Sequence, residues 1–179
     1  MSDTAVLVID MLNTYRHEDA EKLTPCVAEK IDPIAGLIST ARERDDVDLI
    51  YVNDNYGDFS ANQEDLVRQA LEGERPDLVE PIVPQTGELF LQKVRHSAFY
   101  ATSLAYLLRQ LEPERLILTG QVTEQCILYT ALDAYIRHFQ VVVPTDGVAH
   151  IDAELGKASL RMMEENMRAD IVLAEKCLN

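Results

Sequence analysis

The stretch Leu116-Ile-Leu-Thr-Gly-Gln-Val-Thr-Glu-Gln-Cys126 passes from an apolar run into a helical pattern. Residues 115–119 predict a buried strand, and residues 123–138 predict a long amphipathic helix with Thr123 as its N-cap. Cys126 then lies in the first helical turn, where the positive end of the helix dipole lowers the pKa of a thiol. The stretch therefore predicts a nucleophilic cysteine at a strand-to-helix turn.

Outward from this stretch, strand-like and helix-like segments alternate along the chain. Continuous apolar runs indicate strands that are buried on both faces. Their alternation with helices favours a parallel sheet covered by helices on both sides. We expect a single α/β domain over residues 1–179, Rossmann-like, with a six-stranded, mostly parallel sheet. The other predicted strands are residues 5–10, 48–53, 88–93, 140–144 and 170–174, and the other predicted helices are residues 27–44, 62–71, 100–111 and 152–168.

Composition narrows the class of partner. The chain has 179 residues and a net charge of −15, which argues against nucleic acid or an anionic membrane, since both require clustered Lys and Arg. No segment approaches the roughly 20 apolar residues of a membrane span, and residues 5–9 are too short for the core of a signal peptide. Three cysteines without a C-x-x-C pair indicate free thiols. We therefore expect a cytoplasmic protein that acts on a small molecule.

Charged residues end two of the other predicted strands. Asp10 ends the first strand and Lys93 the third, while the turn containing Cys126 follows the fourth. In parallel α/β sheets the functional crevice lies outside the carboxyl ends of the strands, so the three side chains are expected to converge. Partial burial would raise the pKa of Asp10 and suit it to proton transfer. Lys93 would hold both anions in register and lower the pKa of the thiol.

Each of these residues also has an ordinary structural explanation. Cysteine is commonly a small buried hydrophobe, an acid at a strand end is commonly solvated or a cap, and lysine is commonly a surface residue. Cys26, in a predicted loop after Pro25, and Cys177, near the C-terminus, lack the setting of Cys126. We assign those two cysteines a structural role.

Three segments carry a resemblance to a known family. They are Val8-Ile-Asp-Met-Leu-Asn13, Lys93-Val-Arg-His-Ser-Ala-Phe99 and Thr119-Gly-Gln-Val-Thr-Glu-Gln-Cys126. These segments resemble the signature motifs of the isochorismatase-like cysteine hydrolases, in the right order and spacing over nearly the whole chain. That superfamily includes nicotinamidases, N-carbamoylsarcosine amidases, ureidoacrylate amidohydrolases and isochorismatases.

The resemblance implies a role for each matching residue. Asp10 matches the family's general base, Lys93 the lysine that orients the acid and the thiol, and Cys126 the nucleophile. The bond between Val122 and Thr123 matches the family's cis peptide, which turns backbone N–H groups toward the substrate oxygen. The resemblance thus implies a Cys-Asp-Lys triad with an oxyanion site in the turn before Cys126.

The same comparison of motifs bears on metals and on the pocket. Nicotinamidases carry a metal site in an Asp-x-His pattern after the second strand; Asp54 matches that aspartate, but Tyr56 stands where the first histidine is expected. The four histidines show no ligand spacing, so we predict no catalytic metal and no cofactor, and we expect Asp54 and Asp58 to shape a turn. Tyr15 and Phe99 match the family's pocket aromatics, and with Tyr56 they are expected to contact the substrate.

The sequence is compatible with three functions. The first is cleavage of a C–N bond in a small amide or ureido compound through a covalent thioester. The second is an isochorismatase-type vinyl ether hydrolase, which relies on the aspartate without thiol attack. The third is a catalytically silent binding protein on the same fold.

The resemblance also implies a homo-oligomer, for which Leu128, Ala131 and Ile136 are candidate contacts unless they pack on the sheet.

Overall fold

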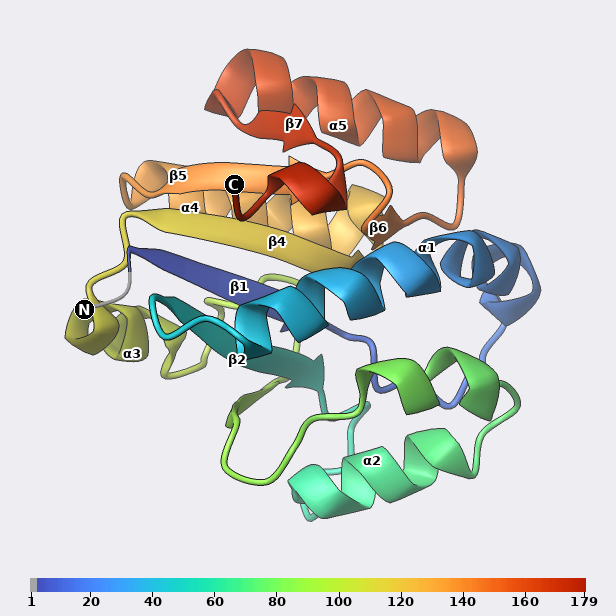
Figure 1. Ribbon diagram of the computed structural model, residues 1–179. Helices are drawn as coiled ribbons and strands as arrows, with labels where there is room; N and C mark the ends of the chain where they lie inside the picture. The colour runs from blue at the N-terminus through green and yellow to red at the C-terminus, as the bar shows by residue number, and fades with distance from the viewer. Residues whose placement is uncertain (1–2) are drawn as a thin grey trace.

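The computed structural model describes residues 3–179 and shows a parallel sheet between two layers of helices (Figure 1). The strands are β1 (Thr4–Ile9), β2 (Val47–Asp54), β3 (Leu89–Lys93), β4 (Arg115–Gln121), β5 (Gln140–Pro144), β6 (Val148–Ala149) and β7 (Asp170–Val172). The α-helices are α1 (Ala20–Arg42), α2 (Gln63–Leu71), α3 (Leu104–Leu111), α4 (Leu128–Ile136) and α5 (Ala153–Met167). The predicted α/β class is confirmed.

The strand order explains where a site can form. It is β3-β2-β1-β4-β5-β7, with β6 pairing with β4, and every strand pair is parallel. The chain builds outward from β1 in one direction and from β4 in the other, so the topological switch point lies between these two strands. The six strands predicted are present. The seventh, β6, has two residues, too few to form a recognisable apolar run.

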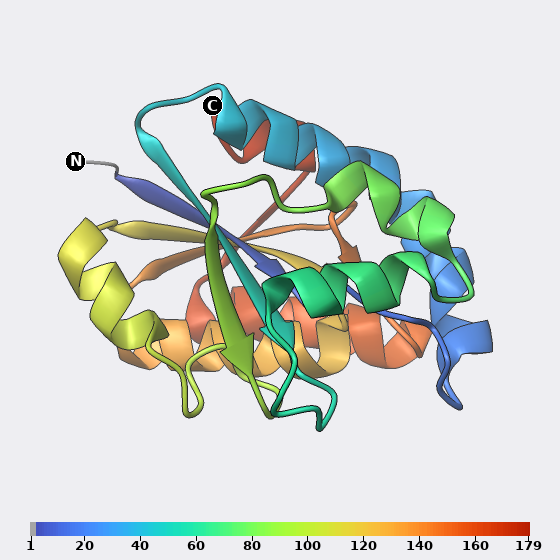
Figure 2. The same ribbon diagram turned by 90° about the horizontal axis from the view of Figure 1, so that it is seen from below.

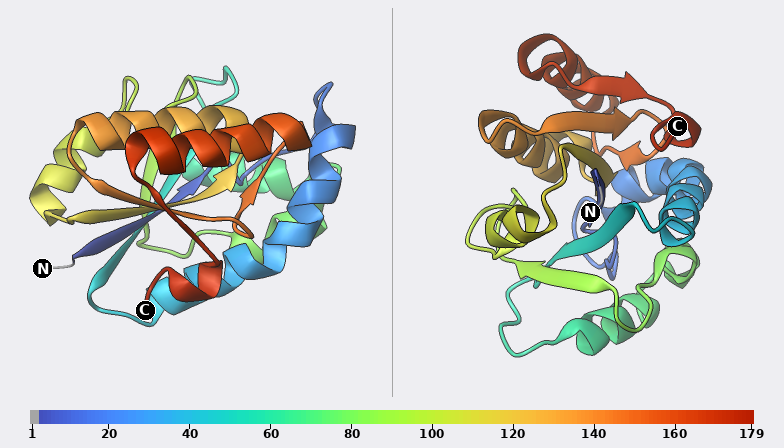
Figure 3. Two further views of the ribbon diagram at one scale, coloured as in Figure 1. Left: turned by 90° about the horizontal axis from the view of Figure 1, so that it is seen from above. Right: turned by 60° about the vertical axis from the view of Figure 1, so that its left-hand side comes forward.

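The central strand is apolar along its whole length because both faces of the sheet are covered. All six residues of β1 are buried. Val6 and Val8 face the core cluster that contains α1, whereas Ala5, Leu7 and Ile9 face the cluster that contains α3, α4 and α5. Figures 2 and 3 show these two helical layers on opposite faces of the sheet. This arrangement is the one that continuous apolar strands predict.

Helix α1 begins earlier than its sequence predicts. The pattern predicts a start at residue 27, but the helix starts at Ala20 and contains both Pro25 and Pro33. A proline inside a helix removes one backbone hydrogen bond, which is why the pattern is interrupted there. Leu23 is buried in the same core cluster as the apolar face of α1, and burial of such apolar side chains stabilises the turns around Pro25. Cys26 therefore lies in a helix and not in the predicted loop.

The turn between β4 and α4 also differs from the prediction. Residues Thr123–Ile127 form one π-helical turn, and α4 begins only at Leu128. Val122 occupies the N-cap position, and the buried hydroxyl of Thr123 has no hydrogen-bond partner in the part of the chain described. The non-prolyl cis peptide joins Gln121 to Val122, one bond before the predicted Val122–Thr123 bond. A motif locates this turn but not the individual bond that is cis.

Gly120 sets how closely the two central strands approach one another. It pairs with Ile9 and has a φ of +118°. A Cβ atom at this position would lie 2.1 Å from the carbonyl oxygen of Ile9. Only glycine fits, and its fit brings the residues that follow it against Asp10.

Among residues 3–179, no helix is long and apolar enough to cross a bilayer.

Candidate active site

A buried lysine joins the acid and the thiol that the sequence singles out. The Nζ atom of Lys93 lies 2.8 Å from Oδ2 of Asp10 and 3.7 Å from Sγ of Cys126. The three residues are 1%, 7% and 9% exposed, respectively. They come from the end of β3, the residue after β1 and the turn after β4. The fold therefore brings together three side chains that are far apart in the chain.

Hydrogen bonds hold both the backbone and the carboxylate of Asp10 in place. Its N–H donates to the carbonyl oxygen of Val52 at 3.1 Å, and its own carbonyl oxygen accepts from Nε2 of Gln121 at 2.7 Å. Its Oδ1 accepts the N–H of Asp54 at 2.7 Å. Asp10 also has a φ of +55°, a conformation that residues other than glycine rarely adopt. A left-handed residue held by this many contacts is typical of a functional position.

Asp54 is a second carboxylate on the same lysine. Its Oδ1 accepts the N–H of Tyr56 at 2.8 Å, which forms the expected turn. Its Oδ2 lies 3.2 Å from Nζ of Lys93, a contact that sequence reasoning missed. The register of β2 with β3, which pairs Asp54 directly with Lys93, places them side by side. Asp58 also shapes a turn, since its Oδ1 accepts from both the N–H and the hydroxyl of Ser60.

Burial controls the electrostatics of the site. Burial raises the pKa of Asp10, although Lys93 and the hydrogen bonds to the carboxylate oppose this shift. Burial also raises the pKa of Cys126, the nearby Asp10 raises it further, and Lys93 lowers it only in part. The expected low thiol pKa is therefore wrong, because desolvation and a neighbouring anion outweigh the lysine and the helix dipole. Burial lowers the pKa of Lys93, but Asp10, Cys126 and Asp54 raise it, and the net direction is upward.

These shifts define the resting state of the site. Asp10 and Cys126 behave as a coupled pair that disfavours two negative charges, while Lys93 stays an ammonium ion. The thiol therefore carries its proton until a group takes it, and the adjacent carboxylate is placed to do so. This arrangement suits proton transfer during nucleophilic attack rather than a preformed thiolate.

The loop after Lys93 is anchored to the helix that follows Cys126. The hydroxyl of Ser97 donates to Oδ2 of Asp133 in α4 at 2.6 Å. The N–H of Ala98 donates to Oγ1 of Thr130, also in α4, at 2.9 Å. These contacts tie the elements that carry the lysine and the thiol to each other, which keeps their separation fixed.

Phe99 belongs to this anchor and not to the pocket. Its ring stacks on that of Phe139 with centroids 6.4 Å apart, and the guanidinium carbon of Arg137 lies 4.7 Å from the ring centroid. The residue is 7% exposed, lies in the core and does not line the cavity beside Cys126. The expected substrate contact is corrected accordingly. A motif marks an aromatic residue as required without showing which way its ring points.

A cavity of about 710 Å³ opens beside Asp10 and Cys126 at the carboxyl edge of the sheet. Loops that follow β1, β2, β3, β4 and β6 form its wall. Tyr56 lines this cavity as expected, and so does Phe59, which sequence reasoning missed although it is 80% exposed. Burial raises the pKa of Tyr56 well above its usual value, and the carboxylates of Asp10 and Asp54 raise it further. About half of the Tyr56 surface is exposed. Its hydroxyl is nevertheless buried, with the side chain of Asn53 as a hydrogen-bond partner.

Tyr15 lies behind the cavity rather than in its wall. It is 3% exposed, and its hydroxyl donates to Oε1 of Gln121 at 3.5 Å. Burial, as the main cause, raises the pKa of Tyr15 to about 12. Because Gln121 holds the carbonyl oxygen of Asp10, Tyr15 supports the site through Gln121 and does not line the cavity as expected.

Glu124 fixes a second part of the wall. Its Oε1 accepts the N–H groups of Ile151 and Asp152, both at 2.9 Å. Ile151 lines the cavity, so the turn that carries Cys126 also positions the segment that leads into α5. Sequence analysis gave no sign of this contact, because it depends on how two distant loops meet.

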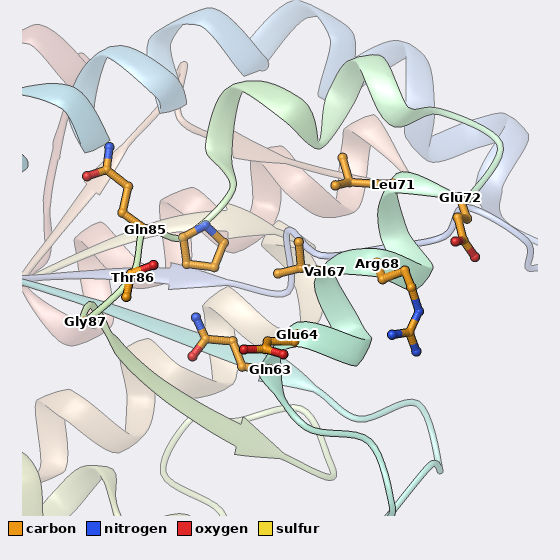
Figure 4. A pocket seen from close by; sticks show the side chains of 10 residues that line it. Gln63, Glu64, Val67, Arg68, Leu71, Glu72, Gln85, Thr86 and Gly87 are labelled. Carbon is orange, nitrogen blue, oxygen red and sulfur yellow. The ribbon is translucent and has the colours of Figure 1, made fainter.

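A separate cavity lies away from the thiol. It has about 600 Å³ and is formed between α2 and the segment that leads into β3 (Figure 4). Among the described residues that line it, none is a cysteine or a histidine. Within residues 3–179, no group of three or more His, Cys, Asp and Glu side chains is placed to hold a metal ion. The chemistry-bearing residues therefore gather in the cavity beside Cys126.

Comparisons with known proteins find similar sequences and a similar fold over nearly the whole chain. The family model described as Isochorismatase domain matches residues 4–176. The isochorismatase family protein YaaI of Bacillus subtilis is 32% identical over 177 residues, which cover 99% of this chain and 97% of that protein. Maleamate amidohydrolase of Pseudomonas putida is 29% identical over 164 residues, which cover 87% of this chain and 76% of that protein. The crystal structure of an isochorismatase-like hydrolase from Alkaliphilus metalliredigens superposes with a TM-score of 0.76 at 25% identity, covering 98% of this chain and 96% of that one.

Proposed function

The chain belongs to the isochorismatase family of hydrolases, and we propose that it cleaves the C–N bond of a small amide or ureido compound through a thioester on Cys126. The observation that carries the proposal is the buried ammonium of Lys93, 2.8 Å from the Asp10 carboxylate and 3.7 Å from the Cys126 sulfur. A base and a nucleophile held by one cation form the arrangement that covalent acyl transfer requires. The maleamate amidohydrolase relative supports an amide as the bond that is cleaved.

The first half of the reaction forms the thioester. Asp10 takes the proton of the Cys126 thiol as the sulfur attacks the carbonyl carbon, and the electron pair of the C=O bond moves to oxygen. Backbone N–H groups in the turn from Val122 through Thr123 to Cys126 are proposed to hold this oxyanion. The oxyanion then re-forms the carbonyl, the C–N bond breaks, and Asp10 gives its proton to the leaving nitrogen.

The second half releases the acid. Asp10, ionised again, takes a proton from water, and the resulting hydroxide attacks the thioester carbon. The C–S bond breaks, the sulfur leaves as a thiolate, and Asp10 returns the proton to it. Lys93 keeps its charge throughout and stabilises whichever of the two neighbouring groups is negative.

The experiment compares ammonia release from a panel of small primary amides and ureido acids by the parent protein and by Cys126→Ala. Cys177→Ala is the matched control, because Cys177 is a buried free thiol that does not line the cavity. We expect Cys126→Ala to lose on the order of 10³-fold or more in kcat, with Cys177→Ala unchanged. Mass spectrometry of the parent enzyme, quenched during turnover, should show an acyl group on the Cys126 peptide.

The outcomes separate the competing functions. Turnover of amides by Cys126→Ala at the parent rate would rule out the thioester. Hydrolysis of isochorismate by both the parent protein and that variant would indicate the aspartate-dependent vinyl ether reaction instead. A protein that binds members of the panel without turning over any of them would be a silent binding protein.

We also propose a homo-oligomer, formed through the outer side of α4. Of the three candidate contacts, Ala131 is fully buried and Leu128 packs against the core, so both belong to the interior of the domain. Ile136 is 57% exposed, and Tyr129 and Leu132 are exposed on the same helix. Light scattering should give a mass above that of one chain, and Ile136→Asp should reduce it. A monomeric parent protein would refute this part of the proposal.

A further inference from the structure

We propose that Arg95 binds a carboxylate of the substrate, so that the preferred compound is a small amide or ureido compound that is also an acid. The inference rests on the proposed function and specifies its substrate class. Three consecutive residues, Val94, Arg95 and His96, line the cavity that contains Cys126.

Arg95 differs from the other cations around this cavity. Arg16, the other arginine of the wall, is held by Oε1 of Glu74 at 3.0 Å and by the carbonyl oxygen of Glu72 at 2.6 Å. Lys93 is bound to Asp10 and Asp54. Among residues 3–179, no acid or hydrogen-bond acceptor is paired with Arg95. Its guanidinium is therefore available to a ligand.

The charges of the site explain why an anionic substrate would need the guanidinium of Arg95. Two carboxylates, those of Asp10 and Asp54, share the single ammonium of Lys93, so these three side chains together carry a net negative charge when both acids are ionised. A neutral amide meets no charge repulsion from these side chains, whereas an anionic substrate needs a further cation. The chain as a whole does not attract anions, since its net charge is −15. Arg95 offsets the repulsion locally.

The backbone that carries Arg95 is fixed at both ends although its side chain is exposed. On one side Lys93 is held by its two carboxylates, and on the other Ser97 is bound to Asp133 at 2.6 Å. Between them His96 adopts a φ of +37°, and its ring packs edge-on against another aromatic ring of α4. A planar guanidinium on a fixed loop can form a two-point contact with a carboxylate.

The test uses two amides of similar size that differ in charge. Succinamate carries a carboxylate, and 4-oxopentanamide carries a neutral methyl ketone in its place. The variants are Arg95→Gln and, as the matched control, Arg109→Gln. Arg109 is also exposed and unpaired among the described residues, but it lies on α3 and lines a different hollow. Both variants remove one positive charge.

We expect the parent protein to prefer succinamate. Arg95→Gln should lower kcat/KM for succinamate about 10-fold, mainly by raising KM, and should leave 4-oxopentanamide unchanged. Arg109→Gln should change neither. Arg95→Glu should reverse the preference. Equal rates for the two amides with the parent protein, or an equal loss on both with Arg95→Gln, would overturn the inference and leave amide hydrolysis intact.

A binding measurement separates this inference from the proposed function. Calorimetry with succinate, a dicarboxylate that no amidase step can consume, should show binding to the parent protein that weakens about 10-fold in Arg95→Gln. This result would support the carboxylate site even if no amide of the panel were hydrolysed. Absence of succinate binding, or equal binding by the two proteins, would refute the role of Arg95 even if amides were turned over.

Discussion

Replacement of Gly120 by alanine tests the close approach of the two central strands. Gly120 has a φ of +118° and pairs with Ile9 in the neighbouring strand. A Cβ atom would lie 2.1 Å from the carbonyl oxygen of Ile9 and 3.0 Å from both its carbonyl carbon and its nitrogen. All three contacts are with backbone, so no side-chain rotation can relieve them. Gly120→Ala must therefore move one strand away from the other.

The size of the effect follows from two terms. A residue other than glycine in such a conformation costs about 1–3 kcal/mol. Forcing an extra carbon into a packed interior costs about 1–3 kcal/mol more. We therefore expect the free energy of unfolding to fall by about 2–6 kcal/mol. With a urea slope of about 2 kcal/mol per molar, the midpoint of unfolding should fall by about 1–3 M.

Urea titration followed by circular dichroism measures this difference. Gly36→Ala is the matched control, because Gly36 lies on the exposed side of α1 and a Cβ there meets no atom within 4 Å. Alanine at position 36 should stabilise the protein by about 0.5–1 kcal/mol. If Gly120→Ala stayed within 0.5 kcal/mol of the parent protein, the argument from strand contact would be refuted.

Three further predictions concern the lysine and its surroundings. Lys93→Met leaves the buried carboxylate of Asp10 and the partly buried carboxylate of Asp54 without a cation. It should lower the free energy of unfolding by about 3–5 kcal/mol in urea, whereas a loss below 1 kcal/mol would contradict the pairing. Iodoacetamide should modify Cys126 slowly at pH 8.5, since burial and Asp10 raise the pKa of the thiol. Asp10→Asn should speed this alkylation, read by peptide mass spectrometry, while abolishing turnover; slower alkylation would refute the stated cause. Ser97→Ala removes a hydrogen bond to a carboxylate of α4 and should cost about 1.5–3 kcal/mol, whereas exposed Ser60→Ala should cost under 0.5 kcal/mol, and equal losses would contradict the anchor.

The fold could be predicted where apolar patterns reflect burial directly. β1 is apolar throughout because helices cover both faces of the sheet, and that pattern is sufficient to identify it. The start of α1 could not be predicted, because Pro25 interrupts the pattern while the packing of Leu23 keeps the helix intact. β6 has only two residues and is a strand solely because it lies beside β4.

The site could be predicted as far as strand ends determine it. Asp10 follows β1 and Lys93 ends β3, so both lie at the same edge of the parallel sheet and their convergence follows from topology. The contact of Asp54 with Lys93 depends on the register of β2 with β3, which no local pattern encodes. The pKa of Cys126 is raised because the surrounding residues exclude water from the thiol. This effect outweighs the lowering of the pKa that the sequence predicts from a position in the first turn of a helix.

Because all the strands run in the same direction, the loops at one edge of the sheet border the cavity and the loops at the other edge do not. The connections at residues 43–46 and 112–114 precede strands, so they lie at the edge opposite the thiol, and none of their residues borders its cavity. A dye, an affinity handle or a linker to a solid support attached there leaves the cavity beside Cys126 open. Groups can therefore be attached at one edge of the sheet while turnover is measured at the other.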